Sequence, residues 1–252
     1  MTDIAQKTVV VTGASSGIGE AIARRFAAAG SRLILAARRQ DRLEALASSI
    51  STNCLCLELD VRDRGAVADA FGSLPEPYRN VDILINNAGL SRGLDKLHEG
   101  NPDGWEEMID TNVKGLLYVS RAVLPGMVAR ESGHVINIGS IAGHEVYPSG
   151  NVYCASKHAV DALTRGLLLD LVDTPIRVST VDPGLVETEF SRVRFYGDAE
   201  RAERVYKGFQ PLRGEDIAEA VYWVAERPAH VQVAQMIILP TAQGSAMVTH
   251  KK

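Results

Sequence analysis

The sequence predicts an α/β protein whose core is a doubly wound parallel sheet of about seven strands with helices on both faces. Short apolar runs alternate with helical patterns from one end of the chain to the other, as is typical of this class. The expected strands are continuous apolar runs, which indicates that both faces of the sheet are covered. No linker, low-complexity stretch or internal repeat interrupts the pattern, so residues 1–252 are expected to form a single domain.

In the first half of the chain, each expected strand is a short apolar run, and the helices follow from their periodicity and end signals. The order is strand Lys7–Val11 ending in Thr-Gly, helix Ile18–Ala29 stopped by Gly30, strand Arg32–Ala36, helix Asp41–Ile50, strand Cys54–Leu59 closed by Asp60, helix Asp63–Gly72 and strand Val81–Asn86.

In the second half, longer helical stretches separate the strands. The order is a helical stretch from about Asp103 to Arg130 with an irregularity near Pro125, strand His134–Gly139, helix Asn151–Val172, strand Ile176–Val181, charged helical pieces up to Gly208, helix Glu215–Glu226 and strand Gln235–Leu239. Ligands of such sheets bind beyond the carboxyl ends of the strands, so the residues at those ends are the functional candidates.

The composition argues against several classes of function. A net charge of −4 gives no sign of a nucleic-acid or membrane-surface partner, and no apolar run reaches the ~20 residues of a membrane span. The polar start, Met1–Lys7, lacks an apolar signal core, so we expect a cytoplasmic protein. Three cysteines argue against a disulfide framework, and Cys54 and Cys56 lack further ligands nearby, so no metal site is expected.

A glycine-rich loop, Thr12–Gly19, follows the first strand and leads into a helix. Glycines at this place let backbone amides approach a pyrophosphate, and the dipole of the helix adds to the attraction. An ordinary turn is the alternative, but the position in a strand–helix–strand unit favours a Rossmann-type dinucleotide site. The residues expected to contact the nucleotide here are Gly13, Ser15, Ser16, Gly17, Ile18 and Gly19.

The end of the second strand indicates which nucleotide binds. NAD-binding sheets place an acid there to hold the ribose 2′-hydroxyl, whereas this chain has Arg38 and Arg39. Guanidinium groups suit the geometry of a 2′-phosphate, so the sequence favours NADP(H) over NAD(H). The alternative is a solvated pair at the start of a helix.

The third and fourth strand ends carry weaker signals. Asp60-Val61 places a carboxylate where it can accept from the adenine amino group, although Asp60 could equally cap the next helix. Asn87-Ala88-Gly89 permits close approach of the backbone to a cofactor, although a simple turn has the same composition.

The end of the fifth strand brings together groups suited to proton transfer. Ser140 ends that strand, and Tyr153 and Lys157 lie four residues apart on one face of the following helix. A phenol with a pKa of ~10 must shift by ~3 units, worth ~4 kcal/mol, to act near neutrality. The Lys157 ammonium and a cofactor's positive ring would supply energy of that order. The alternative is an amphipathic surface helix.

Taken together, these residues resemble the short-chain dehydrogenase/reductase family over nearly the whole chain. The matches are Thr12–Gly19, Asn86–Gly89, Asn112, Ser140, Tyr153–Lys157, and Pro183-Gly184 with Thr188. The resemblance implies a catalytic tetrad of Asn112, Ser140, Tyr153 and Lys157, with Tyr153 as the acid/base and Ser140 polarising the carbonyl. It implies that Lys157 binds the nicotinamide ribose and that Asn112 holds a relay water. It also implies nicotinamide contacts at Pro183, Gly184, Val186 and Thr188, and a homotetramer.

A narrower resemblance concerns the substrate region, about 185–213. Asp182–Ser191, Val193–Phe195, Gly197-Asp198, Pro228–Val231 and Leu239–Thr241 are similar to the NADP-dependent 3-hydroxy acid dehydrogenases, which include serine and L-allo-threonine dehydrogenases. Sulfoacetaldehyde reductases are similar too. The resemblance implies a small polar 3-hydroxy acid as substrate, with another small aldehyde or ketone as the alternative.

Two segments are expected to line the substrate pocket. The loop Ile141–Gly150 offers His144 and Tyr147, together with Glu145, which would repel an anion unless it is paired. Beyond the sixth strand, Arg192 and Arg194 are candidates to clamp a carboxylate or sulfonate, with Arg194 the favoured one. The alternative is that both arginines face solvent or a subunit interface. A different class remains open: a non-catalytic NADP(H)-binding regulatory protein.

Overall fold

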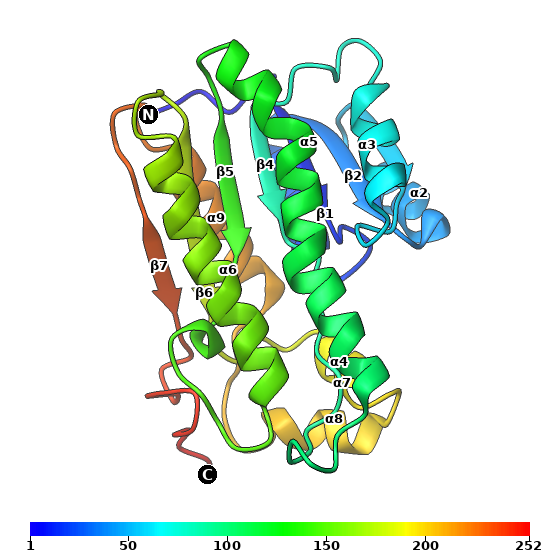
Figure 1. Cartoon of the computed structure of the whole chain (residues 1–252), viewed down its shortest axis with the longest axis vertical. Helices are drawn as coiled ribbons and strands as arrows, with labels where there is room; N and C mark the ends of the chain where they lie inside the picture. The colour runs from blue at the N-terminus through cyan, green and yellow to red at the C-terminus, as the bar shows by residue number, and fades with distance from the viewer.

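The computed structural model describes residues 1–252 and contains a seven-stranded sheet in which all neighbouring strands are parallel. The strand order is β3-β2-β1-β4-β5-β6-β7, so the chain winds outward from β1 in one direction and from β4 in the other (Figure 1). The strands are β1 Thr8–Thr12, β2 Arg32–Ala37, β3 Cys54–Glu58, β4 Ile83–Asn86, β5 His134–Ile138, β6 Arg177–Pro183 and β7 Gln235–Ile238. The predicted fold class is confirmed.

Alternate side chains of each central strand enter two separate apolar layers. In β1, Val9 and Val11 pack with helices α1, α2 and α9, whereas Val10 packs with α3 and α5 on the other face. Helices α5 and α6 cross the front of the sheet in Figure 1, and α9 lies behind it. The helices are α1 Gly17–Ala28, α2 Gln40–Ser49, α3 Arg64–Gly72, α4 Pro102–Ile109, α5 Leu116–Ala129, α6 Asn151–Asp170, α7 Phe190–Arg194, α8 Ala199–Tyr206 and α9 Gly214–Ala225.

The long helical stretch after β4 is irregular at a different place from the one predicted. A π-helical turn, Asp110–Gly115, separates α4 from α5, whereas α5 continues through Pro125. The expected irregularity near Pro125 is therefore wrong. A π turn widens the helix locally, and this one contains Asn112, whose side-chain amide binds the backbone of Leu90 beyond β4. The distortion thus lies where the helix meets the strand ends.

The carboxyl ends of the strands face the segment that carries α7 and α8. The arrows of β4, β5 and β7 point toward the lower end of the molecule in Figure 1, the end at which α7, α8 and α4 lie. The charged helical pieces expected before Gly208 are α7 and α8. No helix has both the length and the apolar character that crossing a membrane requires.

Candidate active site

A cavity of about 330 Å³ opens at the carboxyl ends of the strands. The sequence predictions for the nucleotide come from six separate stretches of chain, and the fold gathers all of them around this space. The lining includes Gly13, Ser15, Ser16, Gly17, Ile18, Gly19, Arg38, Arg39, Asp60, Val61, Asn87, Ala88, Gly89, Tyr153, Lys157, Pro183, Gly184, Val186 and Thr188, together with Ser140. The cavity therefore joins the predicted nucleotide residues to the predicted proton-transfer groups.

The loop between β1 and α1 permits close approach of a ligand to the backbone. Gly13 and Gly17 have φ angles of +67° and +58°, a region that other residues rarely adopt. A Cβ at Gly19 would lie 2.4 Å from the Gly13 carbonyl oxygen, so only glycine lets α1 pack this tightly on the loop. Ser16, the N-cap residue, makes no side-chain hydrogen bond to α1, which leaves the first-turn amides free for an anion.

Hydrogen bonds fix the turn after β4 to the same loop. Asn87 Nδ2 donates to the Thr12 carbonyl oxygen (2.8 Å), and Thr12 Oγ1 accepts from the amides of Asn87 and Ala88 at 3.0 Å each. The Asn87 side chain therefore holds two strand ends together, while Ala88 and Gly89 complete the wall beside it.

Arg39 is anchored at the rim of the cavity. Its guanidinium donates to Ser15 Oγ (3.0 Å) and Ser16 Oγ (2.8 Å), and it pairs with Glu189 (3.3 Å). Glu189 also pairs with Arg42 at 2.9 Å. Burial raises the pKa of Glu189, but the hydrogen bonds from Arg42 and Arg39 outweigh this and lower it. The alternative of a freely solvated arginine pair thus does not describe Arg39.

Arg38 and Asp60 lie on the opposite side of the rim. Arg38 Nη1 is 3.8 Å from Glu107 Oε1, and most of its side chain is exposed. The Asp60 carboxylate accepts from Arg62 Nε (3.0 Å) and Nη2 (2.6 Å). Burial acts to raise the pKa of Asp60, but these bonds to Arg62 lower it overall.

The expectation that Asp60 might cap the next helix is wrong. Asp63 is the N-cap of α3, and its Oδ1 accepts from the Ala66 amide at 2.9 Å. Capping requires a residue directly before the first helical turn, and Asp60 lies four residues before Arg64, where α3 begins.

Tyr153 and Lys157 point from one face of α6 into the cavity. Only 9% of Tyr153 and 7% of Lys157 is exposed, so the alternative of an amphipathic surface helix is wrong. Lys157 Nζ donates to the Ile138 carbonyl oxygen at 2.9 Å, which ties α6 to the end of β5. The phenol and the amine are therefore fixed beside the glycine loop.

The charges around Tyr153 differ from the expectation. Burial raises the pKa of Tyr153, and the Arg194 guanidinium and the Ser140 hydroxyl act in the opposite direction without reversing the shift. Burial also lowers the pKa of Lys157 to about 8, while the Asp182 carboxylate opposes this. In the protein without nucleotide, loss of water around the phenolate dominates the pKa of Tyr153.

Ser140 is oriented by the chain on either side of it. Its Oγ accepts from the Ala142 amide (3.1 Å) and lies 3.5 Å from the Pro183 carbonyl oxygen. The second contact is long for a hydroxyl hydrogen bond, so the Ser140 proton can turn to another acceptor in the cavity.

Asn112 is buried behind the cavity and does not line it. Its Oδ1 accepts from the Leu90 amide (2.8 Å), and its Nδ2 donates to the Leu90 carbonyl oxygen (2.9 Å) and to Ser156 Oγ (3.0 Å). The alternative that this amide caps its own helix is wrong. Ser156 in turn donates to the Tyr153 carbonyl oxygen (2.7 Å), so Asn112 connects the turn after β4 to α6.

Arg194 and Tyr147 meet beside Tyr153, just outside the cavity lining. Arg194 Nη2 donates to the Tyr147 hydroxyl (3.2 Å), and its Cζ lies 5.2 Å from the centre of the Tyr153 ring. The buried Arg194 Nε has no hydrogen-bond partner. Burial raises the pKa of Tyr147, so the hydroxyl stays neutral and leaves the guanidinium with its full charge.

His144 points away from the site. Its Nε2 lies 2.8 Å from Asp182 Oδ2 and 3.2 Å from Gln235 Nε2, and it is absent from the cavity lining. The structure therefore does not bring His144 to the other predicted substrate residues, because the buried carboxylate holds it against β6. Glu145 is paired as well, since its Oε2 accepts from the Ala246 amide (2.8 Å), so it need not repel an anion.

The cysteines lie apart from this chemistry. Cys54 and Cys56 pack on the same face of β3, and Cys154 is buried beside Tyr153, where burial raises its pKa. No group of three or more His, Cys, Asp and Glu side chains is arranged to hold a metal ion.

Comparison with known proteins identifies the family. A model described as short chain dehydrogenase matches residues 7–197, a span that includes the glycine loop, Ser140, Tyr153 and Lys157. The chain belongs to the short-chain dehydrogenase family. The resemblance inferred from the sequence motifs is thereby confirmed.

Several members of the short-chain dehydrogenase family are similar over nearly the whole chain. An NADP-dependent 3-hydroxy acid dehydrogenase of Salmonella typhi is 50% identical, covering 94% of this chain and 96% of its own. One from Schizosaccharomyces pombe is 44% identical, covering 100% and 99%. Among solved structures, the closed form of a serine dehydrogenase complexed with NADP+ has a TM-score of 0.92 at 46% identity, covering 97% and 99%.

Sequence reasoning missed several residues of this short-chain dehydrogenase site. Arg42 lies three residues after Arg39, at helical spacing, and that signal was available. Glu189 and Phe190 lie within the matched stretch Asp182–Ser191 but were not singled out, although both line the cavity. Glu107 and Arg92 lie in different segments and meet only through the fold.

Proposed function

We propose that this short-chain dehydrogenase is an NADP(H)-dependent oxidoreductase that interconverts a small 3-hydroxy acid of the serine type and its carbonyl form. The observation that carries the proposal is the Arg194 guanidinium, which lies beside the Tyr153 ring with its buried Nε unpartnered. The names of the similar enzymes support the same substrate class. We further propose that residues 1–252 act as one catalytic domain, with 185–213 as the substrate segment.

The residues of the cavity fit NADP(H). Free amides at the start of α1 suit a pyrophosphate, and three arginines at the rim, Arg38, Arg39 and Arg42, suit a 2′-phosphate. No acid replaces them at the end of β2 to hold a bare ribose. Bound there, NADP(H) would supply the hydride donor for reduction and the hydride acceptor for oxidation.

The chain's own groups would handle the proton and orient the oxygen. Tyr153, whose pKa burial raises, holds its proton at neutral pH and donates it to the substrate oxygen during reduction. The Ser140 hydroxyl, weakly held at 3.5 Å by the Pro183 carbonyl oxygen, turns to donate to the same oxygen. Lys157, anchored on the Ile138 carbonyl oxygen, adds positive charge when protonated and favours the phenolate in the reverse direction.

The substrate acid group would bind Arg194. A charge-assisted hydrogen bond from this guanidinium to a carboxylate contributes about 1.5–3 kcal/mol. Because Tyr147 is a neutral partner, Arg194 enters that bond with its charge uncompensated. A sulfonate would meet the same group, so sulfoacetaldehyde stays a second candidate substrate. His144, held by Asp182, has no part in this proposal.

The decisive experiment is a turnover screen with NADP+ or NADPH. The panel contains serine, allo-threonine, 3-hydroxypropionate, sulfoacetaldehyde and neutral ketones, each assayed with wild type, Arg194→Met and Arg192→Met. Arg192 is the matched control because it lies on the same short helix and is exposed. We expect turnover of hydroxy acids, and a KM for acids raised about tenfold or more by Arg194→Met alone.

Three results would overturn the proposal. Equal losses in both arginine variants, or a wild type that prefers neutral ketones, would remove the hydroxy-acid assignment. No turnover of any compound, with NADPH still bound, would favour a non-catalytic NADP(H)-binding protein. We propose a homotetramer from the family resemblance, and sedimentation equilibrium would test it.

A further inference from the structure

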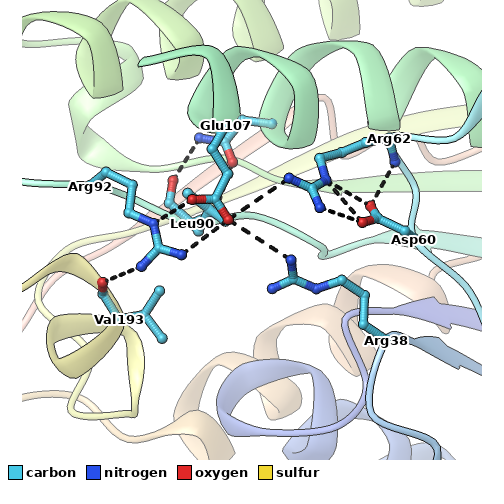
Figure 2. Close-up of polar contacts among 8 residues, drawn as sticks. Arg38, Asp60, Arg62, Leu90, Arg92, Glu107 and Val193 are labelled. Carbon is cyan, nitrogen blue, oxygen red and sulfur yellow. Dashed lines mark hydrogen bonds and ion pairs between the residues drawn. The ribbon is translucent and has the colours of Figure 1, made fainter. Parts of the chain in front are cut away.

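Glu107 lies at the centre of a charged cluster that joins the nucleotide rim to the substrate segment. Arg92 binds its carboxylate with two hydrogen bonds, Nε to Oε2 at 2.5 Å and Nη2 to Oε1 at 3.0 Å (Figure 2). On its other side, Arg38 and Arg62 approach Oε1 at 3.8 and 4.0 Å. One carboxylate therefore faces three guanidinium groups that come from three separate strand ends.

Arg92 connects this cluster to α7, the helix that contains Arg194. Its Nη1 donates to the Val193 carbonyl oxygen (2.7 Å), and the adjacent Gly93 amide donates to the Arg194 carbonyl oxygen (2.9 Å). These are the last two residues of α7. The Val193 carbonyl oxygen also accepts from the Tyr196 amide (3.3 Å), whereas the Arg194 carbonyl oxygen has no partner within the helix. The segment after β4 therefore fixes the end of α7 and with it the backbone of Arg194.

Tight packing restricts the conformation of the Arg92 side chain. A Cβ at Gly104 would lie 3.0 Å from Arg92 Cβ, and the Arg92 guanidinium lies 5.2 Å from the centre of the Tyr196 ring. Both Arg92 and Glu107 are more than four-fifths buried. A bidentate pair with so little solvent around it holds its geometry better than a surface ion pair does.

Glu107 brings the charges at the rim close to balance. Arg38 and Arg62 face Asp60 and Glu107, so two positive charges meet two negative ones, and Arg92 supplies the extra cation that Glu107 binds most closely. An anion arriving near Arg38 competes with Glu107 for that guanidinium. Glu107 therefore opposes an anion at the nucleotide rim while it supports the element that carries Arg194.

We propose that Glu107 is a positioning residue with opposite effects on the two ligands of this enzyme. Through Arg92 it holds the end of α7, so that Arg194 is placed for the acid group of the substrate. Through Arg38 and Arg62 it weakens the hold of the rim on the 2′-phosphate. This inference rests on the proposed function, because it assigns Arg194 to the substrate and Arg38 to NADP(H).

The test compares Glu107→Gln with Glu106→Gln, which removes the same charge from an exposed neighbour on α4. Direct fluorescence titration measures the Kd of NADPH and of NADH, and steady-state assays with a hydroxy acid give KM and kcat. For Glu107→Gln we expect the Kd of NADPH to fall about two- to fivefold, with the Kd of NADH constant. We expect the KM of the acid to rise about fivefold with kcat within about twofold. Glu106→Gln should change neither the Kd of NADPH nor the KM of the acid.

Arg92→Lys separates the two effects and serves if Glu107→Gln does not fold. It keeps the positive charge but loses the bidentate geometry, so we expect a raised KM for the acid without tighter NADPH binding. Weaker binding of both ligands in Glu107→Gln, or identical behaviour of Glu107→Gln and Glu106→Gln, would overturn the inference. Failure of wild type to turn over acids would instead refute the proposed function, while the NADPH-to-NADH ratio would still test the rim effect.

Discussion

Replacing Lys157 by Met should stabilise the protein while abolishing its activity. Burial lowers the pKa of Lys157 from 10.5 to about 8, which corresponds to roughly 3 kcal/mol of unfavourable free energy for holding the ammonium in the folded state. The variant loses the hydrogen bond from Lys157 to the Ile138 carbonyl oxygen, worth about 1 kcal/mol. We therefore expect the free energy of unfolding of Lys157→Met to exceed that of wild type by about 2 kcal/mol near neutral pH, which corresponds to a rise of about 4–8 °C in Tm for a chain of this size.

The pH dependence gives this prediction its signature. Between pH 8 and 10.5, Lys157 is neutral in the folded protein but charged in the unfolded chain, so the unfolded chain binds more protons. Stability of the wild type therefore rises with pH through this window, and the variant lacks that rise. The advantage of Lys157→Met should be complete below pH 8 and should vanish by about pH 10.5.

Urea unfolding followed by circular dichroism at pH 7, 9 and 10.5 measures the effect. Lys96→Met, at an exposed position, is the matched control and should show no gain. Activity is measured in parallel and should be lost in Lys157→Met alone. A Lys157→Met variant that is less stable than wild type at pH 7, or a gain in stability that does not change with pH, would refute the view that burial of the Lys157 ammonium destabilises the fold.

Three further predictions concern the nucleotide cavity. Tyr153→Phe should lower kcat by about 10²–10⁴-fold with the Kd of NADPH within about twofold of wild type, and normal turnover would contradict the acid/base role. Arg38→Ala combined with Arg39→Ala should raise the Kd of NADPH more than about tenfold and leave that of NADH nearly constant, whereas equal losses would contradict the 2′-phosphate site. Gly19→Ala should weaken the binding of NADPH and NADH equally and lower the free energy of unfolding in urea by about 1–3 kcal/mol, because the added Cβ meets the Gly13 carbonyl oxygen. Wild-type binding and stability in this variant would contradict the packing of α1 on the loop.

The fold was predictable because its signals are local. Apolar runs such as Arg32–Ala36 and the glycine loop record burial and turn geometry within a few residues, and parallel topology then places all strand ends at one edge. Most of the nucleotide residues followed from that placement, and Pro183, Gly184, Val186 and Thr188 followed from the family resemblance; every one of them lines the cavity.

The contacts that the sequence did not predict are hydrogen bonds and ion pairs between side chains that lie far apart in the chain. His144 lies in the expected loop, but the buried Asp182 binds it, and no local pattern records that competition. Glu107 and Arg92 meet across two segments for the same reason. The π turn that contains Asn112 also escaped the sequence prediction, and its side chain bonds the distant backbone of Leu90.

The proposed substrate role of Arg194 predicts a link between the choice of substrate and the acidity of Tyr153. Burial raises the pKa of the phenol, and among the groups that oppose this effect Arg194 is the strongest. A carboxylate bound to Arg194 neutralises that cation, so the pKa of Tyr153 rises further and the proton is held more firmly. An acid substrate therefore keeps Tyr153 in the form needed for reduction to a higher pH than a neutral ketone does. In wild type, the pH at which the rate of reduction falls on the alkaline side should be higher for the acid substrate than for a neutral ketone. Arg194→Met should remove this difference between the two substrates. A difference that persists in the variant would show that the guanidinium does not set the charge around the phenol.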